Sequence, residues 1–149
     1  MRSRVLEPVD GLPELVVEDS PAAADVALLE EQVAAAATAA AGLGEEQEFG
    51  IFARADDGRI LAGISAIVWG GSCELQAMWV EEPLRHRGMA HMLIAGAEAE
   101  ARRRGCALVT FHAYDLLARG LYDRLGYETV GVIENCPAGS AARWYRKVL

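Results

Sequence analysis

Three apolar segments separated by two glycine-bearing turns constrain the fold of this chain more than any other feature. The segments are Phe49–Ala55, Arg59–Trp69 and Cys73–Val80, with Asp56-Asp57-Gly58 and Gly70-Gly71-Ser72 between them. An Asp-Gly pair between two such segments favours a hairpin, because the turn requires positive φ angles. The pattern therefore predicts an antiparallel meander of three strands. A meander at this point argues against a dinucleotide-binding βαβ unit.

The rest of the chain alternates between helical and extended patterns. Ser20 and Pro21 are typical of a helix start and Gly42 of a helix end, so we expect a capped helix from Ser20 to Ala41. The other predicted elements are a strand at Leu15–Glu18, a helix at Gly88–Arg104, a strand at Ala107–Phe111, a helix at Leu116–Leu125, and strands at Tyr127–Ile133 and Arg143–Val148. The length of 149 residues favours one domain, so we predict a single α/β (α+β) domain over residues 1–149 with a mixed sheet.

Charge and composition narrow the possible partners. The formal net charge is −8, which argues against nucleic acid as the main partner and fits a cationic amine substrate loosely. No segment approaches the roughly 18 consecutive apolar residues of a membrane helix, so we expect no membrane partner. With no signal-peptide core, the cytoplasm is the expected location. The three cysteines are widely spaced and favour reduced thiols over a disulfide framework or a metal site.

The loop between the third meander strand and the following helix carries the main chemical signal. Gly88 at a helix start leaves backbone N–H groups exposed, and these groups together with the helix dipole bind phosphate. Ala90 keeps the next turn small, while Arg85 and Arg87 add positive charge. The alternative is an ordinary strand-to-helix connection with exposed arginines. The loop is not a Walker loop, because it lacks Gly-Lys-Ser/Thr.

Two motifs at a suitable separation resemble the GNAT superfamily of N-acetyltransferases. Arg85-His86-Arg87-Gly88-Met89-Ala90 matches the superfamily's Gln/Arg-x-x-Gly-x-Gly/Ala signature, and Met78–Leu84 is similar to the sequence that precedes it. Ala118–Tyr127 is similar to a second marker, a helix ending in Tyr-x-x-x-Gly-Tyr/Phe. The resemblance covers roughly residue 49 to the C-terminus. It implies a mostly antiparallel sheet of six to seven strands, flanked by helices, in which the fourth and fifth strands splay apart.

The resemblance also implies acetyl-CoA as the acyl donor, with no metal. The coenzyme A diphosphate is expected on the backbone amides of the loop and the pantetheine arm in the gap between the splayed strands. The implied cofactor-binding residues are Met78, Trp79, Val80, Arg85, His86, Arg87, Gly88, Met89, Ala90, Asp115 and Tyr122. Asp115 stands where many members carry Asn, seven positions before Tyr122. An aspartate there can equally cap the next helix.

The resemblance assigns Tyr122 as the general acid that protonates the leaving thiolate; the alternative is that this ring only packs. A backbone N–H near Trp79 or Val80 is the implied oxyanion donor. Two residues are candidates for the general base, Glu74 and His112. Strand alternation predicts that Glu74, Gln76, Met78 and Val80 share one face. Each candidate base also has a purely structural reading, as an exposed strand residue or a hydrogen-bonding histidine.

The acceptor is the least constrained part of the reaction. In similar proteins the first helix and the following loop, here roughly residues 26–47, form one wall of the acceptor site. A small-molecule primary amine is the leading expectation, ahead of a protein N-terminus or lysine. A coenzyme A-binding module without catalysis is a further alternative, and a homodimer is a possible assembly.

Overall fold

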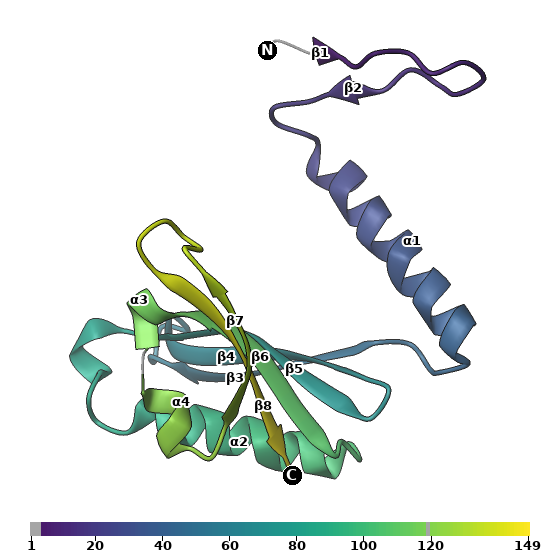
Figure 1. Ribbon diagram of the computed structural model, residues 1–149. Helices are drawn as coiled ribbons and strands as arrows, with labels where there is room; N and C mark the ends of the chain where they lie inside the picture. The colour runs from purple at the N-terminus through teal and green to yellow at the C-terminus, as the bar shows by residue number, and fades with distance from the viewer. Residues whose placement is uncertain (1–3, 119) are drawn as a thin grey trace. The chain divides into compact units, whose positions relative to one another are not determined.

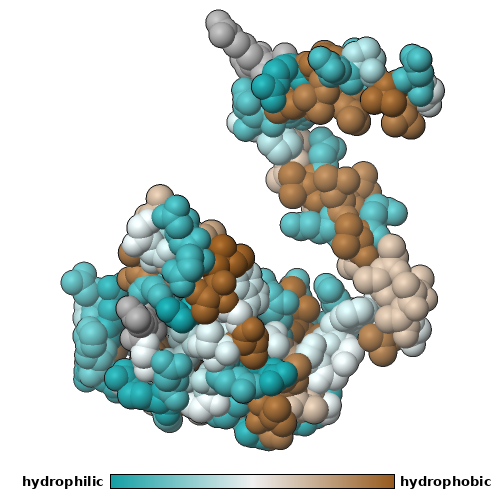
Figure 2. Space-filling model, in the orientation of Figure 1, coloured by the Kyte–Doolittle hydropathy of each residue, from teal (hydrophilic) through white to brown (hydrophobic). Residues whose placement is uncertain are grey.

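The computed structural model describes residues 4–118 and 120–149, which form two compact units that divide after Gly42. The single domain over residues 1–149 stays a prediction. The first unit contains a two-residue antiparallel pair and one helix. Its elements are β1 (Arg4–Val5), β2 (Val16–Val17) and α1 (Ala23–Ala41). Hydrophobic side chains are exposed along this unit, as Figure 2 shows.

The ends of α1 confirm one sequence-based expectation and correct another. Gly42 ends the helix in the left-handed conformation with φ 64°, as expected for a glycine past the last turn. The start is wrong by two to three residues. Ala22 is the N-cap, in an extended conformation, and no side chain caps the helix, because Ser20 stands two residues before the N-cap position.

The second unit is built on one six-stranded sheet with the order β3-β4-β5-β6-β8-β7 (Figure 1). The strands are β3 (Gln47–Arg54), β4 (Ile60–Trp69), β5 (Ser72–Val80), β6 (Leu108–Tyr114), β7 (Glu128–Glu134) and β8 (Ala141–Val148). All neighbouring pairs are antiparallel except β5 and β6. The predicted mixed, mostly antiparallel sheet is confirmed.

The meander β3-β4-β5 forms where the sequence predicts it. In the first turn Gly58 has φ 86° and donates its N–H to the Ala55 carbonyl at 2.9 Å. In the second turn Gly70 and Gly71 have φ 57° and 79°. Side chains with a Cβ rarely adopt these angles, so the glycines fix where the chain reverses.

A bulge in β5 overturns the expected side-chain alternation. Ser65 pairs with Ala77 but Ala66 pairs with Leu75, so Gln76 is an extra residue in β5. An extra residue reverses the alternation of side chains beyond it. Met78 and Val80 therefore pack on the core, like Leu75, while Glu74 and Gln76 are exposed. The predicted common face of Glu74, Gln76, Met78 and Val80 is wrong.

The core lies between one face of the sheet and α2 (Met89–Arg103). The helix buries a stripe at helical spacing, comprising Leu93, Ile94, Ala97, Glu98 and Ala101. Figure 1 shows α2 and α4 on the same side of the sheet. Gly105 follows α2 with φ 80°, as the sequence predicts. No helix among the described residues is long and apolar enough to cross a membrane.

The expected helix at Leu116–Leu125 is instead two short helical turns. They are α3 (Asp115–Ala118) and α4 (Leu121–Arg124). Gly120 separates them in the left-handed conformation, with φ 84°. A residue with that φ cannot continue a right-handed helix, so the expectation of one continuous helix is wrong.

Candidate active site

The parallel strands β5 and β6 separate part of the way along their length. They pair only from Ser72–Glu74 to Leu108–Thr110, yet β5 continues to Val80 and β6 to Tyr114. We call the paired part the closed end of this strand pair and the part beyond it the open end. The splay that the sequence resemblance implies between these two strands is confirmed.

The expected phosphate-binding loop follows β5 at the open end. A short 3-10 helix, η1 (Glu82–Leu84), leads into a turn that ends at Gly88, the N-cap of α2, with φ 85°. The first helical hydrogen bond runs from the Met92 N–H to the Gly88 carbonyl at 3.0 Å. The amides of residues 89–91 therefore point out of the first turn, where the helix dipole favours an anion.

The polar side chains of the loop lie at the surface. Arg85, His86 and Arg87 are exposed. Arg85 folds back on the strand and donates from Nε to the Val80 carbonyl at 2.9 Å, which keeps its charge at the base of the loop. His86 has φ 57°, a left-handed angle that turns the chain sharply just before Gly88. The sequence-predicted loop residues are thus brought together around one helix start.

Met78, Trp79 and Val80 form the last part of β5, beyond its pairing with β6. Their other edge stays paired with β4, where Met78 lies opposite Ile64 and Val80 opposite Ala62. The Met78 and Val80 side chains pack on the core, whereas Trp79 is 50% exposed on the opposite face. What these residues can offer to a ligand in the gap is therefore their main chain.

Tyr122 lies in α4 on the α2 side of the sheet and packs against β6. Its ring centroid is 4.3 Å from that of Phe111, which follows the last β6 residue paired with β5. The ring of Tyr145 lies at 5.2 Å. Burial, and to a smaller extent the neighbouring Tyr145, raise the pKa of the Tyr122 phenol above its usual value. The phenol is therefore protonated at neutral pH.

The two candidate bases lie on the face of the sheet opposite α2. Glu74 is exposed at the point where β5 and β6 separate, and it alternates with buried Cys73. His112 alternates with buried Phe111, and its ring stacks on Trp144 with a centroid distance of 5.2 Å and an interplanar angle of 20°. The candidate acid and the candidate bases thus flank the gap from opposite faces of the sheet.

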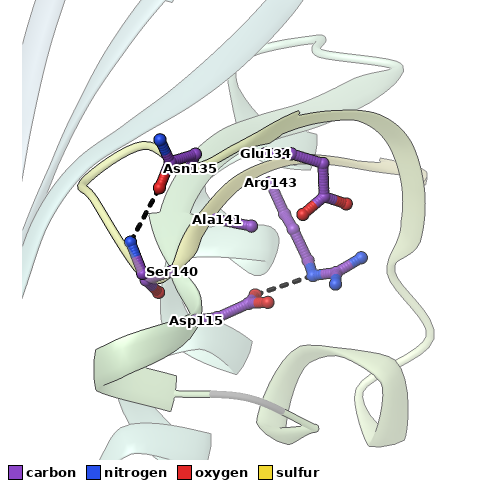
Figure 3. A pocket seen from close by; sticks show the side chains of 7 residues that line it. Asp115, Glu134, Asn135, Ser140, Ala141 and Arg143 are labelled. Atoms are coloured by element: carbon purple, nitrogen blue, oxygen red, sulfur yellow. Dashed lines mark hydrogen bonds and ion pairs between the residues drawn. The ribbon is translucent and has the colours of Figure 1, made fainter.

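Asp115 begins α3 at the open end of β6. Its Oδ1 accepts a hydrogen bond from Arg143 Nε at 2.6 Å, and the ion pair is partly buried. The two side chains meet in a polar pocket of about 580 Å³, which Glu134 and Asn135 also line (Figure 3). The carboxylate of Asp115 and, to a smaller extent, that of Glu134 help to raise the pKa of Arg143. Sequence reasoning missed Arg143, because nothing in the sequence links it to a residue 28 positions away.

A second group that sequence reasoning missed lies beside α4. Glu98 of α2 is 7% exposed. Its carboxylate accepts hydrogen bonds from Lys147 Nζ and from the Tyr127 hydroxyl, each at 3.0 Å. Lys147 also donates to the Leu125 carbonyl at 2.9 Å. A glutamate between Ala97 and Ala101 on the apolar stripe of a helix was the available signal, since a buried carboxylate needs a partner.

Sequence comparison identifies relatives over most of the chain. The sequence model described as "Acetyltransferase (GNAT) family" matches residues 13–127. An acetyltransferase of Agrobacterium fabrum is 29% identical over 106 residues, which are 71% of this chain and 77% of that protein. The blasticidin-S acetyltransferase of Streptomyces morookaense is 30% identical over 92 residues, which are 61% of this chain and 68% of that protein.

Solved structures share the fold. A crystal structure described as an acetyltransferase from Agrobacterium tumefaciens superimposes with a TM-score of 0.83 at 27% identity, covering 91% of this chain and 98% of that one. An aminoglycoside 6'-N-acetyltransferase in complex with coenzyme A superimposes with a TM-score of 0.58 at 22% identity, covering 68% of this chain and 72% of that one. The prediction of an acyl-CoA-dependent acetyltransferase is confirmed by these likenesses. The chain belongs to the acetyltransferase (GNAT) family.

Proposed function

We propose that this protein transfers the acetyl group of acetyl-CoA to a primary amine of a small molecule, directly and within a ternary complex, with Tyr122 as the general acid. The observation that carries the proposal is the gap between β5 and β6, with a helix N-terminus at its open end and a half-buried phenol on one side. Acyl transfer requires an anchored donor, a proton for the leaving thiolate and access for the amine. The helix start can anchor the donor, Tyr122 can supply the proton, and the gap gives access to the amine.

The residues at the open end fit coenzyme A. The amides of Arg87, Gly88, Met89 and Ala90 lie at the start of α2, where helix N–H groups can bind a diphosphate. A Cβ on Gly88 would meet no atom within 4 Å, so the space in front of this turn is open. The main chain of residues 75–80 turns its edge toward β6 without pairing to it and can hydrogen-bond an extended pantetheine arm.

Tyr122 supplies the proton that the departing sulfur needs. When the amine nitrogen bonds to the carbonyl carbon, the carbon–sulfur bond breaks and the sulfur leaves as a thiolate. The Tyr122 hydroxyl donates its proton to that sulfur and is restored from solvent. The raised pKa keeps the phenol protonated until the thiolate forms. An N–H near Trp79 or Val80 stabilises the oxyanion.

The amine is deprotonated from the other face of the sheet. Glu74 lies at the point where the strands separate, and its exposed carboxylate can accept the amine's proton directly or through a water. His112 is the competing candidate, but its ring is stacked on Trp144. Asp115 remains a proposed cofactor contact, and its pairing with Arg143 offsets the negative charge that it would bring near phosphates.

Three observations favour a small-molecule amine as the acceptor. A relative at 30% identity is named for acetylating blasticidin-S, and a protein of the same fold is named for acetylating aminoglycosides. The net charge of −8 also attracts cationic amines. We expect the protein to act in the cytoplasm, and a homodimer is compatible with the fold.

The test measures the turnover of acetyl-CoA with a panel of small amines. The release of free coenzyme A thiol reports the turnover. We expect thiol release that depends on at least one amine and an acetylated amine in the mass spectrum. Tight binding of acetyl-CoA with no turnover across the panel would favour the non-catalytic module. Acetylation confined to protein N-termini or lysines in an incubated extract would favour a protein acetyltransferase.

A further inference from the structure

A partly buried ion pair holds the turn that follows Tyr122. Lys147 Nζ lies 3.0 Å from both carboxylate oxygens of Glu98, and the same Nζ donates to the Leu125 carbonyl at 2.9 Å. The Tyr127 hydroxyl donates to Glu98 Oε1 at 3.0 Å. Glu98 and Lys147 thus connect α2 and β8 to Leu125 and to Tyr127.

The two residues held in this way are bound directly to the backbone of Tyr122. The Leu125 N–H donates to the Tyr122 carbonyl at 3.0 Å, and the Tyr127 N–H donates to the same oxygen at 3.2 Å. The Tyr127 ring also meets the Tyr122 ring edge to face at 6.5 Å. Any shift of Leu125 and Tyr127 therefore moves Tyr122.

The helix that carries Tyr122 cannot fix its own position. α4 has four residues, far fewer than the roughly 12 that an isolated helix needs in water. Gly120 and Gly126 flank it, each with φ 84°, and glycine allows the backbone to turn freely at both ends. The position of Tyr122 must come from contacts with other elements.

We propose that Glu98 and Lys147 are positioning residues for Tyr122: their partly buried ion pair anchors the turn at Leu125 and Tyr127 and so sets the phenol toward the gap between β5 and β6. The inference rests on the proposed role of Tyr122 as the general acid. Neither residue touches the reacting atoms.

A charged pair at this place does what an apolar contact cannot. Lys147 has three donors, and it satisfies the Leu125 carbonyl at the end of α4 while it neutralises Glu98. Removing Lys147 leaves the buried Glu98 carboxylate with Arg102 alone, whose side chain is half exposed and lies 4.0 Å away, whereas replacing Glu98 as well largely avoids the cost of a poorly neutralised buried charge. The pair therefore allows a variant in which stability returns but the hydrogen bond to Leu125 does not.

The test compares kcat, the KM for acetyl-CoA and the thermal midpoint in three variants. Lys147→Met should lower kcat by about 10- to 100-fold, since a misplacement of about 1 Å can cost about 100-fold, and the KM should be unchanged. Its thermal midpoint should fall by several degrees. The double variant Glu98→Gln/Lys147→Met should recover most of the midpoint while kcat stays low. Arg146→Met is the matched control, because this neighbouring cation pairs with Glu128 at the surface, and it should change neither quantity.

A kcat that recovers together with the midpoint in the double variant would overturn the inference, because the pair would then act through stability alone. Tyr122→Phe separates this failure from failure of the proposed function. If Tyr122→Phe lowers kcat and Lys147→Met adds nothing in that background, the inference holds. If both changes lower kcat independently, the acid role stands and the inference fails. If Tyr122→Phe has no effect, both fail.

A spectroscopic readout reports the position of Tyr122 without activity. With ¹³Cζ-labelled tyrosine, the pKa of Tyr122 can be followed by NMR in the folded protein. We expect that pKa to fall toward the ordinary tyrosine value in Glu98→Gln/Lys147→Met, as water reaches the hydroxyl. An unchanged titration in the double variant would count against the inference.

Discussion

The closed end and the open end of the β5–β6 pair are formed by the same two strands but differ in pairing. The strands are hydrogen-bonded to each other at the closed end and separate at the open end. At the closed end, Cys73 and Val109 are fully buried and pair across the strands. At the open end the two strands no longer pair, and Gly88 and Tyr122 lie near the gap between them. The difference shows how one sheet can supply both stability and a site. Where β5 and β6 are paired, their backbone N–H and C=O groups hydrogen-bond to each other. Where the strands separate, these groups are available to a ligand.

The largest effect is expected from Tyr122→Phe, at the open end. This substitution removes the hydroxyl and little else, so kcat should fall about 100-fold, the lower range for loss of a general acid. The KM for acetyl-CoA should change little. Steady-state kinetics with one amine acceptor gives both values, and an unchanged kcat would remove Tyr122 from the mechanism.

The same residue predicts a pH dependence. Because the pKa of Tyr122 is raised, the acid form persists through neutral and mildly alkaline pH and is lost only as the pH rises through that raised value. kcat should therefore show no decline between about pH 7 and pH 9.5, below the ordinary tyrosine pKa of about 10. A decline in this interval that Tyr122→Phe abolishes would show that the pKa is lowered instead.

The closed end should respond in stability rather than in catalysis. Val109 is fully buried, and Val109→Ala should lower the free energy of unfolding by about 2 kcal/mol through lost packing. Urea denaturation measures that change. The KM for acetyl-CoA should stay within about twofold, as for changes away from a binding site. A large rise in KM would mean that the two ends are not separate.

A pair of glycines allows the proposed phosphate-binding loop to be compared with an ordinary turn. Gly88 and Gly58 have φ of 85° and 86°, and a Cβ on either meets nothing within 4 Å. Alanine at each position should therefore introduce similar backbone strain, about 1 kcal/mol. Calorimetric titration should show coenzyme A binding weakened about tenfold, or about 1.4 kcal/mol, by Gly88→Ala, because the added Cβ stands where the diphosphate approaches the backbone. Gly58→Ala should leave it unchanged, and equal weakening by both would point to a general loss of structure.

The smallest effect is expected from His112→Gln. The ring is exposed and stacked on Trp144, so its replacement should change kcat less than about twofold. Glu74→Gln, at the point of separation, should lower kcat more than His112→Gln does if the carboxylate is the base, and both variants are compared at several pH values. The reverse order of effects would assign the base to His112.

The sequence predicted the parts of this molecule that local patterns determine. The Asp56-Asp57-Gly58 turn predicted the meander. The motifs at residues 85–90 and 118–127 predicted the splayed strands and the family. Local patterns could not reveal the bulge at Gln76, because it depends on how β4 and β5 pair, nor the break at Gly120, because a glycine within an apolar pattern is also tolerated in a helix. The roles of Arg143 and Lys147 could not be predicted from the sequence for a similar reason. Each meets its carboxylate partner, Asp115 or Glu98, only after the sheet has formed.

The central claim is that the open end binds the acyl donor and the closed end does not. Titration of the ¹⁵N-labelled protein with coenzyme A, followed through its backbone amide resonances, tests it most directly. We predict saturable shifts for the amides of residues 87–90 and 76–80, with little change at residues 72–74 and 108–110. Saturable binding that shifts the closed end and leaves the amides of residues 87–90 unmoved would contradict the account.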